Sequence, residues 1–352
     1  MNPSSSEDLR NNLSWLGILA AIQFAMLMLF VAWIPLPRMY SWADSAEYQR
    51  IALFIVGRGD LAQGYPQFFP PGEPFVVSIF YLLFGNISYA SLVTNFLFGL
   101  GCLFAVRSLT QSTRLSVLFM FIPYWFILSF STLGDASFIF LELVAGWFAI
   151  KRRWLESVVV GSLSMLFRPE GLFLIAVIGV LALKRARFEK KFLVPPAVAI
   201  LALLTWGLVA FNNPFTYFAV YATHRTSVSV GGLIQPWMQD YAMGLVGKGK
   251  IAYVVATLIV SIGTLTRCFR RFGLFHFFFL ETLALTLAHT ILSPGQIYPD
   301  MVKSYLQIAP FTLIAFKEIL LRRFIVVLAF LVPLSLFVAV VFWTVTFSVH
   351  FI

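Results

Sequence analysis

The chain has 352 residues, of which 60% are hydrophobic and only 11% are charged. Soluble domains carry roughly 25% charged residues, so this composition excludes an ordinary soluble protein and favours one that lies in a lipid bilayer. The net charge of +10 does not indicate a nucleic-acid partner, because the basic residues form short clusters between apolar stretches, as membrane topology produces. The two cysteines, Cys102 and Cys268, are far apart in sequence and do not indicate a disulfide.

Apolar stretches of about 20 residues recur along the chain and predict about eleven transmembrane helices. They are expected at 13–36, 88–107, 115–131, 136–150, 155–168, 171–184, 192–212, 251–266, 273–291, 303–320 and 324–349. The first stretch is longer than the apolar core of a signal peptide, so we expect it to be retained as a helix. The predicted fold is an all-α integral membrane protein, with residues 1–352 as a single multi-pass domain.

The basic clusters predict which ends of these helices face the cytoplasm. With a cytoplasmic N-terminus, all of them fall on the inner side: Arg107 with Arg114, Lys151 to Arg153, Lys184 to Lys191, Arg267 to Arg271, and Arg322 with Arg323. The outer segments are then 37–87, 132–135, 213–250 and 292–302, and they carry seven acids: Asp44, Glu47, Asp60, Glu73, Asp135, Asp240 and Asp300. We therefore expect a functional site on the outer face of the cell membrane, or of the endoplasmic reticulum membrane if the source is eukaryotic.

The first outer segment, 37–87, is the richest in acids. Residues 44–56 can form a helix with Asp44 or Ser45 as its N-cap. If the helix instead begins just before Asp44, Glu47 and Tyr48 follow at i+3 and i+4 and lie beside that acid. The apolar piece 75–84 follows several prolines and is too short to cross a bilayer, so we expect it to be a half-buried part of the same segment.

Several short motifs follow one another in this order. They are Trp42-Ala43-Asp44, Phe68-Phe69-Pro70, Leu133-Gly134-Asp135 and Arg168-Pro169-Glu170-Gly171. Together with the expected membrane sidedness, they resemble the GT-C glycosyltransferase superfamily over nearly the whole chain. The resemblance is greatest to the GPI mannosyltransferase II and dolichyl-phosphate-mannose protein mannosyltransferase types.

The resemblance implies an inverting glycosyltransferase that moves a hexose of the mannose type from a polyprenyl-phosphate donor to a lipid-linked or surface glycan acceptor. It implies that Asp44 acts as the general base that takes the proton of the acceptor hydroxyl. Glu47 is the second carboxylate beside it, and Asp135 matches the second outer acid of the superfamily. Asp135 is expected to orient the acceptor or to share a divalent metal, although the sequence does not point to enough ligands for one.

A lipid phosphate leaves in this reaction, so a cation is expected where its charge develops. The candidates for binding the donor phosphate are Arg168, Lys303, Arg225 and His224. For Arg168 the alternative is an ion pair with Glu170 or simple snorkelling, and for the other loop residues it is a solvated position. The candidates for a substrate loop are Tyr48, Glu73 and Trp237, of which the last could equally belong to an interfacial aromatic belt.

Two other functions stay open on the sequence alone. A transporter or flippase of lipid-linked sugars would use the acids within predicted spans, Glu142 and Glu281. It should lose function when either is changed, while tolerating a change at Asp44. A non-catalytic subunit of a glycosylation complex would tolerate both kinds of change.

Overall fold

The computed structural model describes residues 3–33, 40, 43–61, 66–123, 125, 129, 134–185, 189–219, 255–256, 259–267 and 307–349. Over these ranges the protein is helical and contains no strand, which confirms the all-α prediction. The helices in chain order are α1 (Pro3–Trp33), α3 (Ala43–Ile55), η1 (Pro66–Phe68), α4 (Gly72–Phe84), α5 (Ile87–Thr110), α6 (Thr113–Met120), α8 (Asp135–Ile150), α9 (Trp154–Ser164), α10 (Gly171–Arg185), η2 (Lys190–Leu193), α11 (Val194–Phe211), α17 (Lys317–Arg322) and α18 (Phe324–Val349).

Two helices in the described part of the chain are long and apolar enough to cross a membrane. They are α5 and the continuous helix formed by η2 and α11, over 190–211. Shorter apolar helices lie at 17–29, 72–84, 171–183 and 324–338. The spans expected at 251–266 and 303–320 are described only in part, and the one expected at 273–291 lies outside the described residues.

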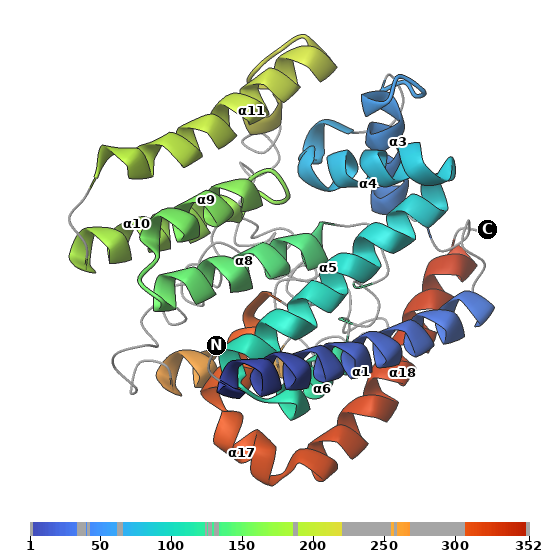
Figure 1. Cartoon of the computed structure of the whole chain (residues 1–352). Helices are drawn as coiled ribbons and strands as arrows, with labels where there is room; N and C mark the ends of the chain where they lie inside the picture. The colour runs from blue at the N-terminus through green and yellow to red at the C-terminus, as the bar shows by residue number, and fades with distance from the viewer. Residues whose placement is uncertain are drawn as a thin grey trace.

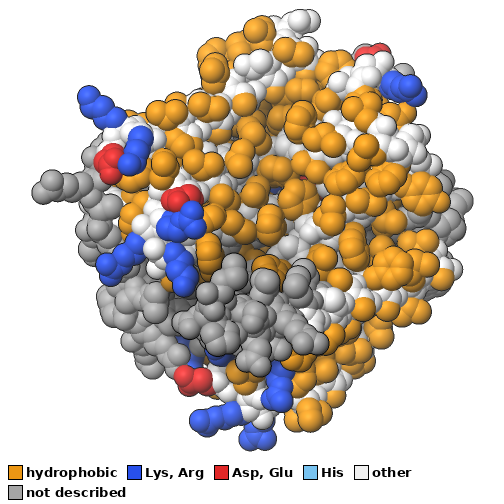
Figure 2. Space-filling model, in the orientation of Figure 1, with side chains coloured by type: hydrophobic (Ala, Val, Ile, Leu, Met, Phe, Trp, Pro, Cys, Tyr) orange, Lys and Arg blue, Asp and Glu red, His pale blue; other side chains and the backbone are white. Residues whose placement is uncertain are grey.

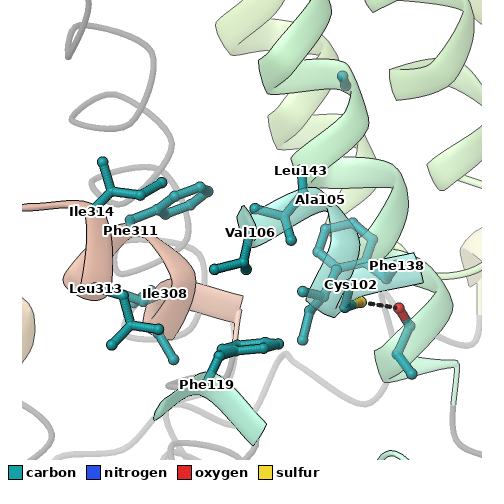
Figure 3. Packing of buried hydrophobic residues seen from close by; sticks show 14 of the residues in the cluster. Cys102, Ala105, Val106, Phe119, Phe138, Leu143, Ile308, Phe311, Leu313 and Ile314 are labelled. Atoms are coloured by element: carbon teal, nitrogen blue, oxygen red, sulfur yellow. Dashed lines mark hydrogen bonds between the residues drawn. The ribbon is translucent and has the colours of Figure 1, made fainter. Parts of the chain in front are cut away.

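The helices pack around α5 and α8. Figure 1 shows α8, α9 and α10 side by side, α1 alongside α5, and α3 with α4 near the N-terminal end of α5. The main apolar core joins α5, α6, α8 and the helical residues 307–315. Figure 3 shows this core, with Val106, Phe119 and Phe311 pointing toward one another and the Cys102 thiol donating to the Ala136 carbonyl at 3.3 Å.

The surface of the molecule is unusually apolar. Figure 2 shows hydrophobic side chains over most of the visible face, with lysines and arginines toward its left and lower edges and at its upper right. Large side chains on three helices are mostly exposed, for example Leu83 on α4 (70%), Val209 on α11 (66%) and Ile325 on α18 (78%). Contiguous exposed apolar surface of this kind is rare on soluble monomers and indicates contact with lipid or protein.

Prolines explain two differences between the expected and observed helix ends. The stretch expected to be helical over 115–131 forms α6, which ends at Met120, because residues that precede a proline such as Pro123 disfavour the helical conformation. In contrast, α4 begins directly after Pro71 and holds Pro74 in its first turn, where backbone N–H groups have no helical acceptor. The prolines therefore start α4 instead of breaking it, and Gly85 ends it in the left-handed conformation.

Candidate active site

The predicted acidic helix is present as α3, and it begins one residue before Asp44. Asp44 therefore lies in the first helical turn, and Glu47 and Tyr48 follow at the spacing that places their side chains beside it. Tyr48 is 3% exposed, and Ile51 and Ala52 are fully buried. This buried face packs α3 against α4, so the acid end of α3 is held by the fold.

A buried ion-pair cluster joins the start of α8 to the turn between α9 and α10. Arg168 Nη1 lies 2.5 Å from Asp135 Oδ1, and its Nε and Nη2 each donate to one oxygen of Glu170 at 3.2 Å. The Asp135 side chain is 1% exposed and that of Arg168 is 19% exposed. Burial alone would lower the pKa of Arg168, but Asp135 and then Glu170 outweigh it and hold that pKa well above its ordinary value.

Tyr48 connects α3 to this cluster. Its ring packs edge-on against Phe69 with the ring centroids 5.0 Å apart. A Cβ atom on Gly134 would lie 3.0 Å from the Tyr48 hydroxyl and 3.1 Å from the Phe167 carbonyl oxygen, and the φ of Gly134 is +71°. Glycine has no Cβ atom and adopts a positive φ without steric cost, so Gly134 lets the phenol approach the turn that begins α8.

Glu47 and Asp44 differ in their surroundings although they share one helix. Glu47 is 4% exposed and forms an ion pair with Arg50, with Nη1 to Oε1 at 2.6 Å. Its second oxygen, Oε2, is buried and has no hydrogen-bond partner within the described residues. Asp44 is half-buried, so a substrate can reach it more easily than it can reach Glu47.

Glu73, in the first turn of α4, is a buried acid that forms no ion pair with an arginine in the described part of the chain. It is 1% exposed, and it forms a short hydrogen bond with the Ser137 hydroxyl of α8. The pKa of Glu73 is raised to about 7, chiefly by burial; the hydrogen bond with Ser137 lowers it in part, and the nearby Asp135 adds to the rise. The dipole of α4 favours a charged Glu73 by roughly 0.3–1 kcal/mol, whereas removing an ion from water costs several kcal/mol, so burial dominates.

The start of α4 is also fixed to the α9–α10 turn by its backbone. The Gly72 N–H donates to the Leu166 carbonyl at 2.7 Å. A Cβ atom on Gly72 would lie 2.5 Å from that same oxygen. Glycine at this position therefore lets two chain segments touch, and it brings Glu73 close to Asp135.

The structure brings together Asp135, Arg168, Glu73 and Tyr48, which the sequence placed in separate motifs. Glu170, the alternative partner expected for Arg168, does pair with it. Ser137 was not anticipated, because a serine within an apolar helix resembles a packing residue and nothing in its spacing signals a partner on α4. The other predicted site and motif residues, Trp42, His224, Arg225, Trp237 and Lys303, lie outside the described residues.

The described residues do not gather three His, Cys, Asp or Glu side chains around a point where a metal could bind. Arg168 already contacts the carboxylates of Asp135 and Glu170, so this donor set does not fit a divalent metal as it stands. A metal shared by Asp135 stays a prediction of the resemblance alone.

No protein-family model, curated protein or solved structure matches this chain. The order of the sequence motifs and the side chains of the site therefore carry the functional inference.

Proposed function

We propose that this protein is a multi-pass inverting glycosyltransferase of the GT-C type. It moves a hexose from a polyprenyl-phosphate donor to a lipid-linked or surface glycan acceptor at the outer face of the membrane. The observation that supports it best is the buried cluster of Asp135, Arg168 and Glu170, which Tyr48 reaches from α3. The half-buried Asp44 lies one helical turn before Tyr48 on that helix. Buried ionisable groups collected at the ends of apolar helices are expensive and mark functional sites.

The distribution of charge along α8 supports the membrane orientation. Asp135 begins this helix, and the exposed residues Lys151, Arg152 and Arg153 follow its last residue. The 16 residues span about 24 Å at 1.5 Å per residue, which approaches the roughly 30 Å hydrocarbon thickness of a bilayer. Acids at one end and bases at the other fit an outer site and a cytoplasmic basic edge.

In the proposed reaction, Asp44 accepts the proton of the acceptor hydroxyl as that oxygen attacks the anomeric carbon of the sugar. The bond from the anomeric carbon to the phosphate oxygen breaks, and the lipid phosphate leaves with the electron pair. One displacement of this kind inverts the anomeric centre. Asp135, held by Arg168, is proposed to orient the acceptor beside Asp44.

The role of Arg168 at the donor phosphate depends on its present partners. Two carboxylates already compensate its charge, so it contacts the phosphate only if one of them gives way. We therefore assign Arg168 first to positioning Asp135. Lys303, Arg225 and His224, outside the described residues, remain the other candidates for binding the phosphate.

The test is sugar transfer from a labelled polyprenyl-phosphate hexose to extracted acceptors, in membranes that hold equal amounts of each variant. Asp44→Asn should lower transfer by about 10²–10⁴-fold, the usual contribution of a general base. Asp60→Asn is the matched control, because Asp60 is an exposed acid beyond the end of α3. Full transfer by Asp44→Asn would show that another group is the base.

A transporter of lipid-linked sugars is the second candidate, favoured by one observation. Glu142 is fully buried in the middle of α8, and an acid at such depth is often part of a translocation pathway. In that case Glu142→Gln abolishes function and Asp44→Asn is tolerated, which is the reverse of the result expected for the enzyme.

A further inference from the structure

The Ser137 hydroxyl lies within hydrogen-bond distance of two acceptor oxygens, of which the Gly134 carbonyl also accepts the Phe138 N–H at 3.1 Å. Ser137 Oγ is within hydrogen-bond distance of Glu73 Oε2 and lies 3.1 Å from the Gly134 carbonyl oxygen. A serine hydroxyl has one proton to donate, and a carbonyl has none. Both contacts become full hydrogen bonds when Glu73 carries a proton and donates it to Ser137, which then donates its own to Gly134.

The surroundings of Glu73 also favour the protonated form. Among the described residues no lysine, arginine or histidine forms an ion pair with it, in contrast to Glu47, Asp135 and Glu170. Two acidic groups interact electrostatically with Glu73, namely Asp135 on α8 and the buried Tyr40. An ionised carboxylate with no cation, placed beside a second acid, is unfavourable in a buried position.

The charged groups on the neighbouring elements do not supply a cation that would favour the ionised form of Glu73. On α3, which packs against α4, Glu47 and Arg50 are paired with each other. In the α9–α10 turn, Arg168 is engaged by Asp135 and Glu170. From α5, the uncharged Asn95 reaches the neighbouring Tyr40.

We infer that Glu73 is a protonated carboxylic acid below neutral pH and a positioning residue for Asp135. Its O–H donates to Ser137, and the Ser137 O–H donates to the carbonyl of Gly134. This chain of hydrogen bonds fixes the left-handed turn from which Asp135 projects toward Arg168. Ionisation of Glu73 turns the Ser137 hydroxyl away from Gly134 and places a second negative charge near Asp135.

The role in catalysis rests on the proposed glycosyl transfer, whereas the protonation of Glu73 does not. Two readouts on the full chain in detergent or membranes therefore keep the two apart. The first is the unfolding midpoint of the wild type and of Glu73→Gln, which keeps the shape of a neutral carboxyl and a donor to Ser137. From about pH 5 to about pH 8 the wild type should lose stability relative to Glu73→Gln. Parallel curves over this range would overturn the inference.

The second readout is the pH profile of sugar transfer. Wild-type transfer should fall by up to about tenfold per pH unit above the ionisation of Glu73, while the Glu73→Gln profile stays flat there. Ser137→Ala should lower transfer at every pH. Ser78→Ala is its matched control, because this buried serine of α4 donates to Phe75 of its own helix at 2.7 Å and should leave transfer unchanged.

The combined results separate the possible failures. If the wild type transfers no sugar from any donor, the proposed function fails, and the unfolding curves still confirm or overturn the protonated Glu73. If the unfolding curves behave as expected but wild type and Glu73→Gln share one pH profile of transfer, the positioning role is wrong.

Discussion

Replacing Arg168 by methionine tests whether the cluster at the start of α8 is held together by its charge. Arg168→Met keeps much of the side-chain length but leaves Asp135 and Glu170 without their cation. Their side chains are 1% and 10% exposed, so water cannot replace the arginine. Removing one partner of a buried ion pair costs about 3–5 kcal/mol. Because the Arg168 side chain is itself 19% exposed, we expect the lower end, about 3 kcal/mol.

The assay is denaturant unfolding of the detergent-solubilised protein, followed by far-ultraviolet circular dichroism. The double variant Arg168→Met with Asp135→Asn should recover at least about 1 kcal/mol, because one of the two uncompensated charges is then gone. The loss in the single variant should also shrink at low pH. Without Arg168 the two acids bind protons more readily when folded, so protonation stabilises the variant.

The control is Arg153→Met, which breaks an exposed ion pair with Glu156 in which the side chains are 53% and 40% exposed. Exposed pairs of this kind contribute little, so no measurable loss is expected. Two results would show that the cluster does not depend on a buried charge. The first is an Arg168→Met variant that unfolds like the control. The second is a double variant whose loss of stability is no smaller than the sum of the losses in Arg168→Met and Asp135→Asn measured singly.

Three further predictions concern stability and the membrane. With a pKa of 4.5 when unfolded and about 7 when folded, Glu73 lowers stability by about 3 kcal/mol as pH rises through this window, and Glu73→Gln should remove that slope in pH-dependent unfolding. Gly72→Ala forces a Cβ atom to within 2.5 Å of the Leu166 carbonyl oxygen, so it should lower the free energy of unfolding by about 1–3 kcal/mol. The control is Gly179→Ala on α10, where a Cβ atom would have nothing within 4 Å. It should raise the free energy of unfolding by up to about 1 kcal/mol in the same assay. Leu201→Asp near the centre of α11, where Leu201 is 62% exposed, should lower membrane insertion by about 3 kcal/mol, and an unchanged membrane-inserted fraction would contradict a transmembrane α11.

Local features of the sequence predicted the helices well. The apolar stretches at 88–107, 136–150 and 171–184 correspond to α5, α8 and α10 within about three residues. The acidic helix at 44–56 was predicted from the spacing of its apolar residues, and it is present as α3. These features depend on residues that are close in sequence, where helical periodicity is a direct signal.

The contacts of the site could not be predicted in the same way. Asp135 and Arg168 are 33 residues apart and Glu73 and Ser137 are 64 residues apart, and no periodicity relates residues at such distances. The sequence left Arg168 open between Glu170 and the donor phosphate, and it did not suggest Asp135 as a partner. Packing of α8 against α9 and of α4 against the α9–α10 turn creates both contacts.

The acids of the site lie at or just before the starts of helices, which explains how one small region holds so many of them. A helix start favours a negative charge by roughly 0.3–1 kcal/mol, which is less than the cost of burying one. Each buried acid of the site therefore needs a further partner, either an arginine or, for Glu73, its own proton. Asp44 is half-buried and keeps part of its hydration, so an acceptor can reach it at the start of α3. A general base must be accessible to its substrate, and among the acids of the site Asp44 meets this condition best.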